Sequence, residues 1–192
     1  MHKLIISVAT LLVLSGCIER SCNEANDANT PFNKAIAVLV KDKDDSPAFT
    51  LLENGLDVNH QNACGASFLH IATIVGNKEL VDYLLQREAN PNIVNWQGET
   101  PVFMAAQWSE NYIITKLLAS GGDPNFVVED DTYLYNTPLL IATLNNNIEG
   151  VRILKSYGGN VGYVNSEGIS VADLAEKEGF VEIQEIARNG QP

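Results

Sequence analysis

The three histidines are considered first, because an imidazole can bind a metal ion or act as a general acid or base near neutral pH. His2, His60 and His70 lie far apart in the sequence. No pair of Cys or His residues has the short spacing of a metal-binding motif. The sequence therefore predicts no metal site, and we interpret His60 as an isolated side chain.

A run of aspartates in the segment KDKDDSP superficially suggests a calcium site. Asp42, Asp44 and Asp45 supply carboxylates, but the segment lacks the central Gly and the closing Glu of an EF-hand loop. We interpret it as a solvated turn. Residues 168–172, GISVA, lack the second glycine of a nucleophile elbow. We therefore expect no catalytic residues, no cofactor and no small-molecule substrate, and the protein is not expected to be an enzyme.

The first of the cysteines, Cys17, follows a segment with the features of a targeting signal. Lys3 supplies a positive charge, and an apolar run from Leu4 to Leu14 comes next. This run is too short for a permanent transmembrane helix, which needs about 20 residues. Residues 1–16 are therefore predicted to be a cleaved signal peptide.

The residues Leu14-Ser15-Gly16-Cys17 resemble the lipobox of bacterial lipoproteins. The resemblance implies that Cys17 is lipidated and begins the mature chain; an ordinary signal peptide with an incidental Cys is the alternative. In a Gram-negative cell, Ile18 is not the Asp that resembles an inner-membrane retention signal. We therefore expect the chain in the cell envelope, anchored by lipid at the periplasmic face of the outer membrane.

Residues 17–29 are polar and are predicted to be a tether between the lipid and a folded domain. The tether contains Cys22, and Cys64 lies in a later loop. In an oxidising compartment these two residues could form a disulfide, which would fold the tether back onto the domain. Two unpaired thiols are the alternative, and the spacing alone does not decide between them.

The net charge of −12 for the full chain excludes several classes of partner. Removal of residues 1–16 takes away Lys3 and no acid, which leaves 11 basic and 24 acidic side chains, a net charge of −13. Such a chain is not expected to bind nucleic acid or anionic lipid headgroups. The charge is typical of a protein that binds a basic protein partner, or of one that is simply kept soluble.

The elements that position any site follow from an internal repeat. Ser or Thr residues able to cap a helix recur with spacings of 37, 33, 37 and 33 residues, at Thr30, Ser67, Thr100, Thr137 and Ser170. The extra four residues of the first spacing lie in LVKDKDDSPAF, between the two helices of the first unit, and those of the third spacing follow Asn125. The pattern predicts five helix–turn–helix units.

The stretch from Gly98 to Asn125, GETPVFMAAQWSENYIITKLLASGGDPN, resembles an ankyrin repeat, which reads roughly G-x-T-P-L-H-x-A-A and then L-L-x-x-G-A-x-x-N. Pro101 fits the first helical turn, and Gly121-Gly122 ends the second helix, where left-handed backbone is needed. The resemblance implies an all-α ankyrin-repeat solenoid of about five helix–turn–helix units with hairpin loops, covering residues 30–192. His70 matches the His of the pattern and is expected to bond backbone.

Ankyrin arrays usually bind partners with their hairpin tips and inner helices, so aromatic and acidic residues near these positions are the candidates. The predicted partner-binding residues are Trp96, Trp108, Tyr112, Glu129, Asp130, Asp131, Tyr133 and Tyr135. Aromatic anchors ringed by charge are typical of protein-binding hot spots. The alternative is that Trp108 packs under the neighbouring repeat and that the tyrosines only brace a long loop.

The resemblance implies a protein that acts by binding another protein. Small ankyrin-repeat lipoproteins of the bacterial envelope resemble immunity proteins, which bind and neutralise toxic effectors such as phospholipases delivered by type VI secretion. The chain is therefore expected to be such an immunity protein. An envelope scaffold or stress-protective lipoprotein with several protein partners is the alternative function.

Overall fold

The computed structural model describes residues 30–129 and 134–189, and these residues fold into helices joined by turns and long hairpin loops. Among them no strand forms, and the backbone pairing is limited to an isolated bridge between Gln61 and Ser67. The ten helices are α2 (Pro31–Asp42), α3 (Ser46–Glu53), α4 (Phe68–Val75), α5 (Lys78–Gln86), α6 (Pro101–Gln107), α7 (Asn111–Ala119), α8 (Pro138–Leu144), α9 (Ile148–Ser156), α10 (Val171–Glu178) and α11 (Val181–Arg188).

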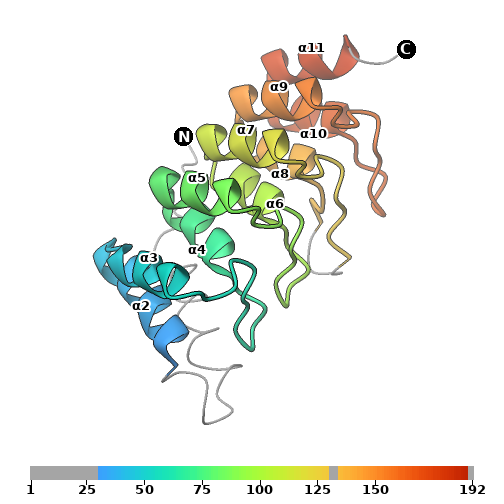
Figure 1. Ribbon diagram of the computed structural model, residues 1–192. Helices are drawn as coiled ribbons and strands as arrows, with labels where there is room; N and C mark the ends of the chain where they lie inside the picture. Colours follow the sequence, from blue (N-terminus) through green and yellow to red (C-terminus); the bar gives the residue numbers. More distant parts are fainter. Residues whose placement is uncertain (1–29, 130–133, 190–192) are drawn as a thin grey trace.

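The helices form two stacked rows (Figure 1). Helices α2, α4, α6, α8 and α10 make the inner row, and the outer row contains their partners α3, α5, α7, α9 and α11. Each helix pair packs on the next pair along the chain, as expected for a solenoid in which a repeat buries its apolar face against its neighbours. The predicted all-α solenoid of five helix–turn–helix units is confirmed.

Four long loops project from one side of the stack (Figure 1). We name them hairpin one (54–66), hairpin two (88–99), hairpin three (121–136) and hairpin four (157–169), and together they form the hairpin face. Each hairpin precedes an inner helix, so it lies at the N-terminal end of that helix.

The inner helices begin at the five predicted Ser and Thr residues. Each of these residues has extended backbone, and its hydroxyl accepts a hydrogen bond from the N–H group three residues later. For example, the Phe103 N–H donates to Thr100 Oγ1 at 3.3 Å. These bonds satisfy N–H groups that a helix leaves unpaired at its start. The predicted helix starts are confirmed.

The four extra residues of the first repeat extend its inner helix. Helix α2 has 12 residues, whereas α4 has 8. The difference is about one helical turn of 3.6 residues, so the insertion preserves the direction in which α2 presents its apolar side chains. The helix ends at Lys43, which adopts left-handed backbone with φ of 58°.

The core lies between the two rows and runs through all repeats. Leu69, Phe103 and Leu139 of the inner row are buried. Leu84 and Leu117 cover them from the outer row and have no exposed surface. Close packing after α7 leaves no room for a side chain at Gly122, because an added Cβ would lie 2.6 Å from a methyl group of Val102.

Asparagine side chains join one hairpin to the next. The Asn90 N–H donates to Asn59 Oδ1 at 2.8 Å, and the Asp123 N–H donates to Asn92 Oδ1 at 2.8 Å. The Asn160 N–H completes the series by donating to Asn125 Oδ1 at 2.7 Å. Because each bond crosses a repeat boundary, the hairpins are fixed relative to one another as well as to their own helices.

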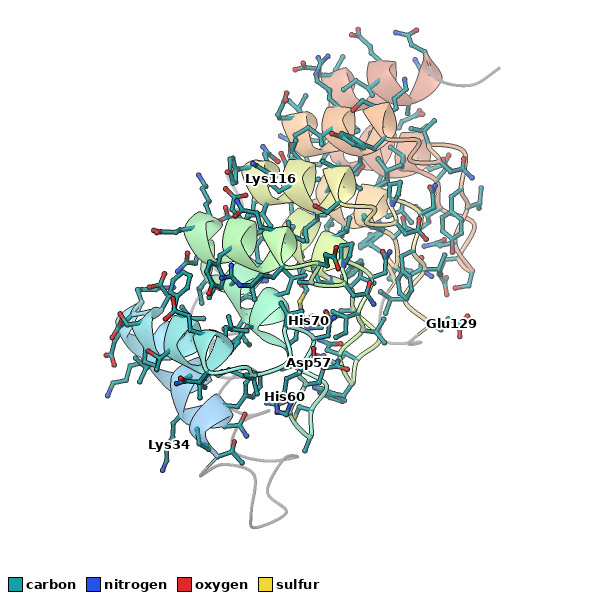
Figure 2. All side chains as sticks on the ribbon, in the orientation of Figure 1. Lys34, Asp57, His60, His70, Lys116 and Glu129 are labelled. Atoms are coloured by element: carbon teal, nitrogen blue, oxygen red, sulfur yellow. The ribbon has the colours of Figure 1, made fainter. Side chains whose placement is uncertain are left out.

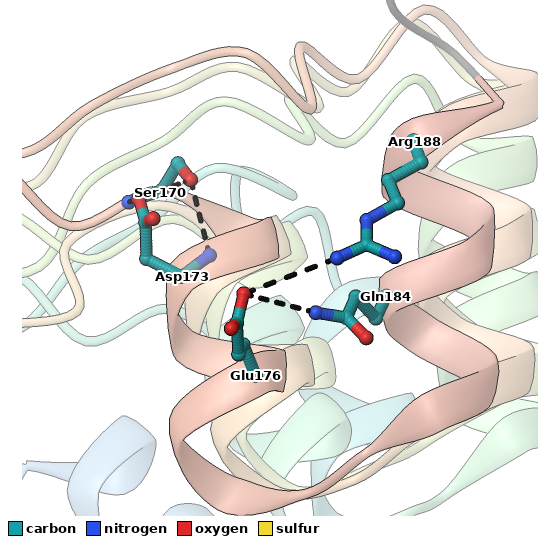
Figure 3. A network of polar contacts seen from close by, with 5 residues as sticks. All are labelled: Ser170, Asp173, Glu176, Gln184 and Arg188. Atoms are coloured by element: carbon teal, nitrogen blue, oxygen red, sulfur yellow. Dashed lines mark hydrogen bonds and ion pairs between the residues drawn. The ribbon is translucent and has the colours of Figure 1, made fainter.

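The last helix pair ends the solenoid with a polar surface (Figure 3). The Glu176 carboxylate accepts a hydrogen bond from Gln184 at 3.1 Å and lies 4.0 Å from the Arg188 guanidinium. The hydroxyl and N–H of Ser170 both donate to Asp173 and lower the pKa of its carboxyl group. The glutamates of α11 face solvent, and this agrees with a terminal repeat that no further unit covers.

The predicted signal peptide (1–16), the lipidated Cys17 and the tether (17–29) lie outside the described residues. The described domain begins at Thr30, which caps α2. None of the described helices combines the length and the hydropathy needed to cross a bilayer.

Candidate protein-binding surface

Trp96 lies at the tip of hairpin two, as predicted, and 55% of its surface is exposed. The tip is ordered by Asn95, whose side-chain oxygen accepts hydrogen bonds from the N–H groups of Gln97 and Glu99 at 2.9 Å each. The backbone N–H of Trp96 donates to the backbone carbonyl of Cys64 in hairpin one at 3.1 Å. A large indole is therefore held at the solvent edge of the hairpin face by backbone bonds from two repeats.

Trp108 lies at the other end of its inner helix. It is the C-cap of α6 and is half-buried, and its N–H donates to the Met104 carbonyl at 3.0 Å. Helix α6 has 7 residues and therefore rises about 10 Å between its hairpin end and Trp108. The sequence placed Trp108 correctly beside the inner row, but the structure does not bring it to the tip that carries Trp96.

Tyr112 belongs to the outer row and so does not share a surface with Trp96. Its hydroxyl donates to the Asp82 carboxylate of α5, and Lys116 lies 3.4 Å from the same carboxylate. The ammonium groups of Lys78 and Lys116 lie 5.4 and 5.2 Å from the centre of the Tyr112 ring. Tyr112 and Asp82 raise the pKa of Lys116. This cluster joins α5 to α7 and accounts for Tyr112 as a structural contact.

The long third hairpin is described only in part. The Val128 N–H donates to the Asn136 carbonyl at 2.9 Å and closes the loop, which places the exposed Glu129 beyond the closure. Tyr135 is half-buried against the core, in agreement with the alternative that it braces the loop. Three further predicted residues, Asp130, Asp131 and Tyr133, lie outside the described residues.

A row of valines on successive hairpins was missed by the sequence reasoning. Val94, Val127 and Val164 occupy the same position of hairpins two, three and four, and their spacing of 33 and 37 residues follows the repeat. Val94 is 41% exposed and Val164 is 53% exposed, whereas Val127 is half-buried. We name these residues the valine row. The signal that could have identified them was the recurrence of valine at one hairpin position. Most buried apolar residues lie in helices, so an apolar residue that recurs in a loop is a candidate for exposure.

A groove runs between hairpins two and three, next to the valine row. Its cavity is about 510 Å³. The residues that line this valine groove are Val94, Gly98, Asp123, Asn125, Phe126, Val127 and Glu129. Apolar side chains and a glycine therefore alternate with two carboxylates and an amide, a composition that suits a side chain with an apolar body and a polar or cationic end.

Charges are divided between the two sides of the molecule. The four hairpins contain no Lys or Arg, and inner helices α4, α6 and α8 contain no Asp, Glu, Lys or Arg. Within the described chain, all ion pairs join helices: α5 to α7, α9 to α11 and α10 to α11. Figure 2 shows the two sides, with Lys116 on the outer row and Glu129 extending from the hairpin side. The hairpin face is therefore both acidic and apolar.

The two described histidines have structural positions. His70 is buried, and its ring contacts Ser67 Oγ at 2.9 Å and the Glu99 carbonyl at 3.3 Å, which confirms the predicted bonds to backbone. Burial lowers its pKa to about 4. From the sequence we interpreted His60 as an isolated side chain. In the structure its ring packs edge-on against Phe32, with the ring centroids 4.6 Å apart.

Cys64 is disulfide-bonded. It is buried in hairpin one, where its N–H donates to Asn62 Oδ1 at 3.0 Å. Cys22, the candidate partner in the sequence, lies outside the described residues. Among the described residues, no group of three His, Cys, Asp or Glu side chains could hold a metal ion.

Comparison with known proteins agrees with the repeat pattern. Residues 35–127 match the family of ankyrin repeats in three copies. The chain is 38% identical to ankyrin repeat protein FPV031 of Fowlpox virus (strain NVSL) over 109 residues, which are 56% of the chain and 32% of that protein. It is 32% identical to ankyrin repeat and SOCS box protein 11 of Homo sapiens over 127 residues, 66% of the chain and 38% of that protein.

Rabankyrin-5 of Homo sapiens is 30% identical over 180 residues, which cover 87% of the chain and 14% of that protein. The chain thus spans about a third of the length of the first two relatives and less of the third. What these proteins share with it is the repeat itself. Residues 35–127 therefore match ankyrin repeats, and the described residues fold into an all-α solenoid of helical repeats.

Proposed function

We propose that the chain binds a single protein partner through the hairpin face. The observation that carries the proposal is the exposure of Trp96, Val94 and Val164 on hairpins that contain no Lys or Arg. Exposed aromatic and aliphatic side chains gathered on one surface are typical of protein interfaces. Helices α6 and α8, which follow hairpins two and three, contain no charged residue, and hydrogen bonds between the hairpins order the surface.

More narrowly, we propose that the partner is a toxic effector, such as a type VI secreted phospholipase, and that the chain is its immunity protein. The pattern around Cys17 supports a lipid anchor at the periplasmic face of the outer membrane. A disulfide at Cys64 fits an oxidising compartment of this kind. An inhibitor tethered to the membrane would meet a lipase at the surface that the enzyme attacks, and an acidic groove could cover its substrate entrance.

Affinity capture tests the partner. The full-length chain, tagged at its C-terminus and extracted from envelopes in detergent, is used as bait, and bound proteins are identified by mass spectrometry. One stoichiometric partner with a hydrolase sequence, whose purified activity falls when the chain is added, would support the immunity function. A diffuse set of envelope proteins would instead indicate the scaffold or stress-protective function.

The same capture tests the surface. The double variant Trp96→Ala with Val164→Ser removes two exposed apolar groups from the hairpin face, and Val181→Ser removes one from α11, where Val181 is 66% exposed. Loss of the partner with the first variant and retention with the second would support the hairpin face. Equal retention by both variants would place the interface elsewhere.

The anchor is tested separately. Replacing Cys17 by Ser removes the acceptor of the proposed lipid, so the chain is expected to move from the membrane to the soluble fraction and to lose incorporation of a palmitate analogue. Cys22→Ser is the matched control for the anchor, because it removes a neighbouring Cys side chain that does not accept the proposed lipid. Membrane retention of the Cys17 variant would contradict the lipid anchor.

A further inference from the structure

We propose that the valine groove binds a partner segment in which an apolar side chain stands next to a Lys or Arg. This inference rests on the proposed function, because it specifies the chemistry of the partner at one place on the hairpin face. The apolar side chain would enter the groove between hairpins two and three, and the cation would lie over the carboxylates at its rim.

The groove has an apolar lining that water solvates poorly. Val94 and Val127 line it from neighbouring hairpins, and Phe126 contributes an aromatic ring. Its cavity of about 510 Å³ lies within the range of roughly 300–1,000 Å³ that is usual for sites that hold a small molecule. One aliphatic or aromatic side chain with its flanking backbone therefore fits the space, and its burial would remove Val94 from solvent.

The rim of the groove is negative. Asp123 and Glu129 both line it and both are exposed. One oxygen of Asp123 accepts a hydrogen bond from the Asn125 N–H at 2.8 Å, which holds the carboxylate in place. Neither residue has an ion-pair partner among the described residues. The four hairpins contain no Lys or Arg, so a cation carried by a partner could approach both carboxylates.

Charge complementarity therefore selects the occupant. An acidic segment or a lipid headgroup bearing phosphate would be repelled by the rim, and a purely apolar segment would leave the two carboxylates uncompensated. A segment with a lone cation would leave the valines exposed to water. A cation beside an apolar side chain satisfies both parts of the groove, and an exposed loop of a basic protein would supply it.

The test uses three acetylated dipeptide amides, leucyl-arginine, glycyl-arginine and leucyl-glutamate, titrated into the ¹⁵N-labelled full-length chain in detergent micelles. Backbone amide shifts are followed by NMR. Leucyl-arginine is expected to shift the amides of Val94, Gly98 and Val127 and to saturate. Glycyl-arginine should bind about ten-fold more weakly because it lacks the buried side chain. Leucyl-glutamate should bind about five-fold more weakly because it lacks the cation.

Matched variants assign the two parts of the groove. Val127→Ser is expected to weaken leucyl-arginine and leave glycyl-arginine unchanged, whereas Glu129→Gln should weaken both arginine peptides. The controls are Val181→Ser on α11 and Glu149→Gln on α9, which change the same residue types on the outer row and should alter neither titration. Similar affinities for all three peptides, or shifts confined to other residues, would overturn the proposal.

Two further outcomes identify other occupants and would also overturn it. Shifts of the groove amides that grow with protein concentration in the absence of peptide would indicate a second copy of the chain. In the second outcome, the peptides cause no shift at Val94 and Val127, while the variant of Trp96 and Val164 still loses the captured partner. That result would contradict binding in the groove and leave the hairpin-face interface in place. The two proposals therefore fail separately.

Discussion

The outer row and the hairpin face differ in the partners that their charged side chains have within the described chain. On the outer row, cations have partners within the chain: Lys116 pairs with Asp82, Arg152 pairs with Glu182, and the Lys155 ammonium donates to the Ile186 carbonyl at 2.7 Å. On the hairpin face, the carboxylates of Asp123 and Glu129 form no ion pair with any described residue, and they line a groove together with Val94, Phe126 and Val127. The outer row is satisfied internally, and the hairpin face gains most from a partner.

The comparison also separates residues that stabilise the solenoid from those that bind. Asparagines near the base of hairpins one, two and three accept hydrogen bonds from backbone of the next repeat, whereas Val94, Val164 and Trp96 expose apolar surface to solvent. Substitutions at the base should therefore change stability, and those near the tip should change affinity.

The largest effect is expected at the tips. The variant Trp96→Ala with Val94→Ser should lose about 2–4 kcal/mol of binding free energy for the captured partner, which is the range of strong hot spots. The free energy of unfolding should change by less than about 1 kcal/mol, because both side chains are largely exposed. Calorimetric titration and urea unfolding of the same preparations measure the two quantities. A large loss of stability with little loss of affinity would reverse the proposed division.

Acid should weaken the attachment of hairpin two to the core through His70. Its folded-state pKa of about 4 lies below the value of 6.5 for an exposed histidine, so the unfolded chain binds more protons between these pH values. Stability is complete above pH 6.5 and falls as the pH decreases toward 4, by about 3 kcal/mol in total. Urea unfolding at pH 7 and pH 5 measures part of this loss.

His70→Gln is the control for the acid effect. It removes the titrating ring, so its stability at pH 7 is expected to be lower but to vary less between pH 7 and pH 5 than that of the unchanged protein. Identical pH dependence in both proteins would show that other groups dominate.

The bonds between hairpins should have an intermediate effect. Asn92 accepts from the Asp123 N–H, and its amide donates to the Gly121 carbonyl at 2.9 Å. Asn92→Ala removes both bonds and should destabilise the chain by about 1–2 kcal/mol. Hydrogen exchange should accelerate at the Asp123 amide first. Unchanged exchange there would mean that the bond contributes little to the order of hairpin three.

The smallest effect is expected on the outer row. Tyr112→Phe removes the hydroxyl that donates to Asp82 and leaves the ring between two ammonium groups. Stability should change by less than about 1 kcal/mol, since exposed polar contacts contribute little, and affinity for the partner should not change. A loss of affinity above ten-fold would return Tyr112 to the binding surface that the sequence predicted for it.

The fold could be predicted from the sequence because its signals are local. A Ser or Thr that caps a helix works within four residues, as at Thr100 and Thr137, and the period carries this assignment from one repeat to the next. The four-residue insertion could also be placed, although its form as an extra turn of α2 depends on packing that the pattern does not contain.

The candidate site could be predicted only in part, because a repeat position does not give the contacts of a side chain. Trp96 lies at a tip and Trp108 at the end of an inner helix, as the repeat pattern places them, whereas Tyr112 contacts Asp82 on the outer row. The valine row was missed for a different reason. Val128 and Val161 in the same hairpins are buried, and Val94 and Val164 are exposed, so residue type alone could not separate anchors for a partner from anchors for the hairpin.

The asparagine bonds between hairpins have a consequence for recognition. Asn59, Asn92 and Asn125 each accept a hydrogen bond from the backbone of the following hairpin. The four hairpins are therefore linked into one continuous structural unit. A partner would meet a surface whose loops are already ordered, so little of the association free energy would be lost in arranging them. A pre-ordered hairpin face favours slow dissociation of the complex and binding of few partners over adaptable binding of many.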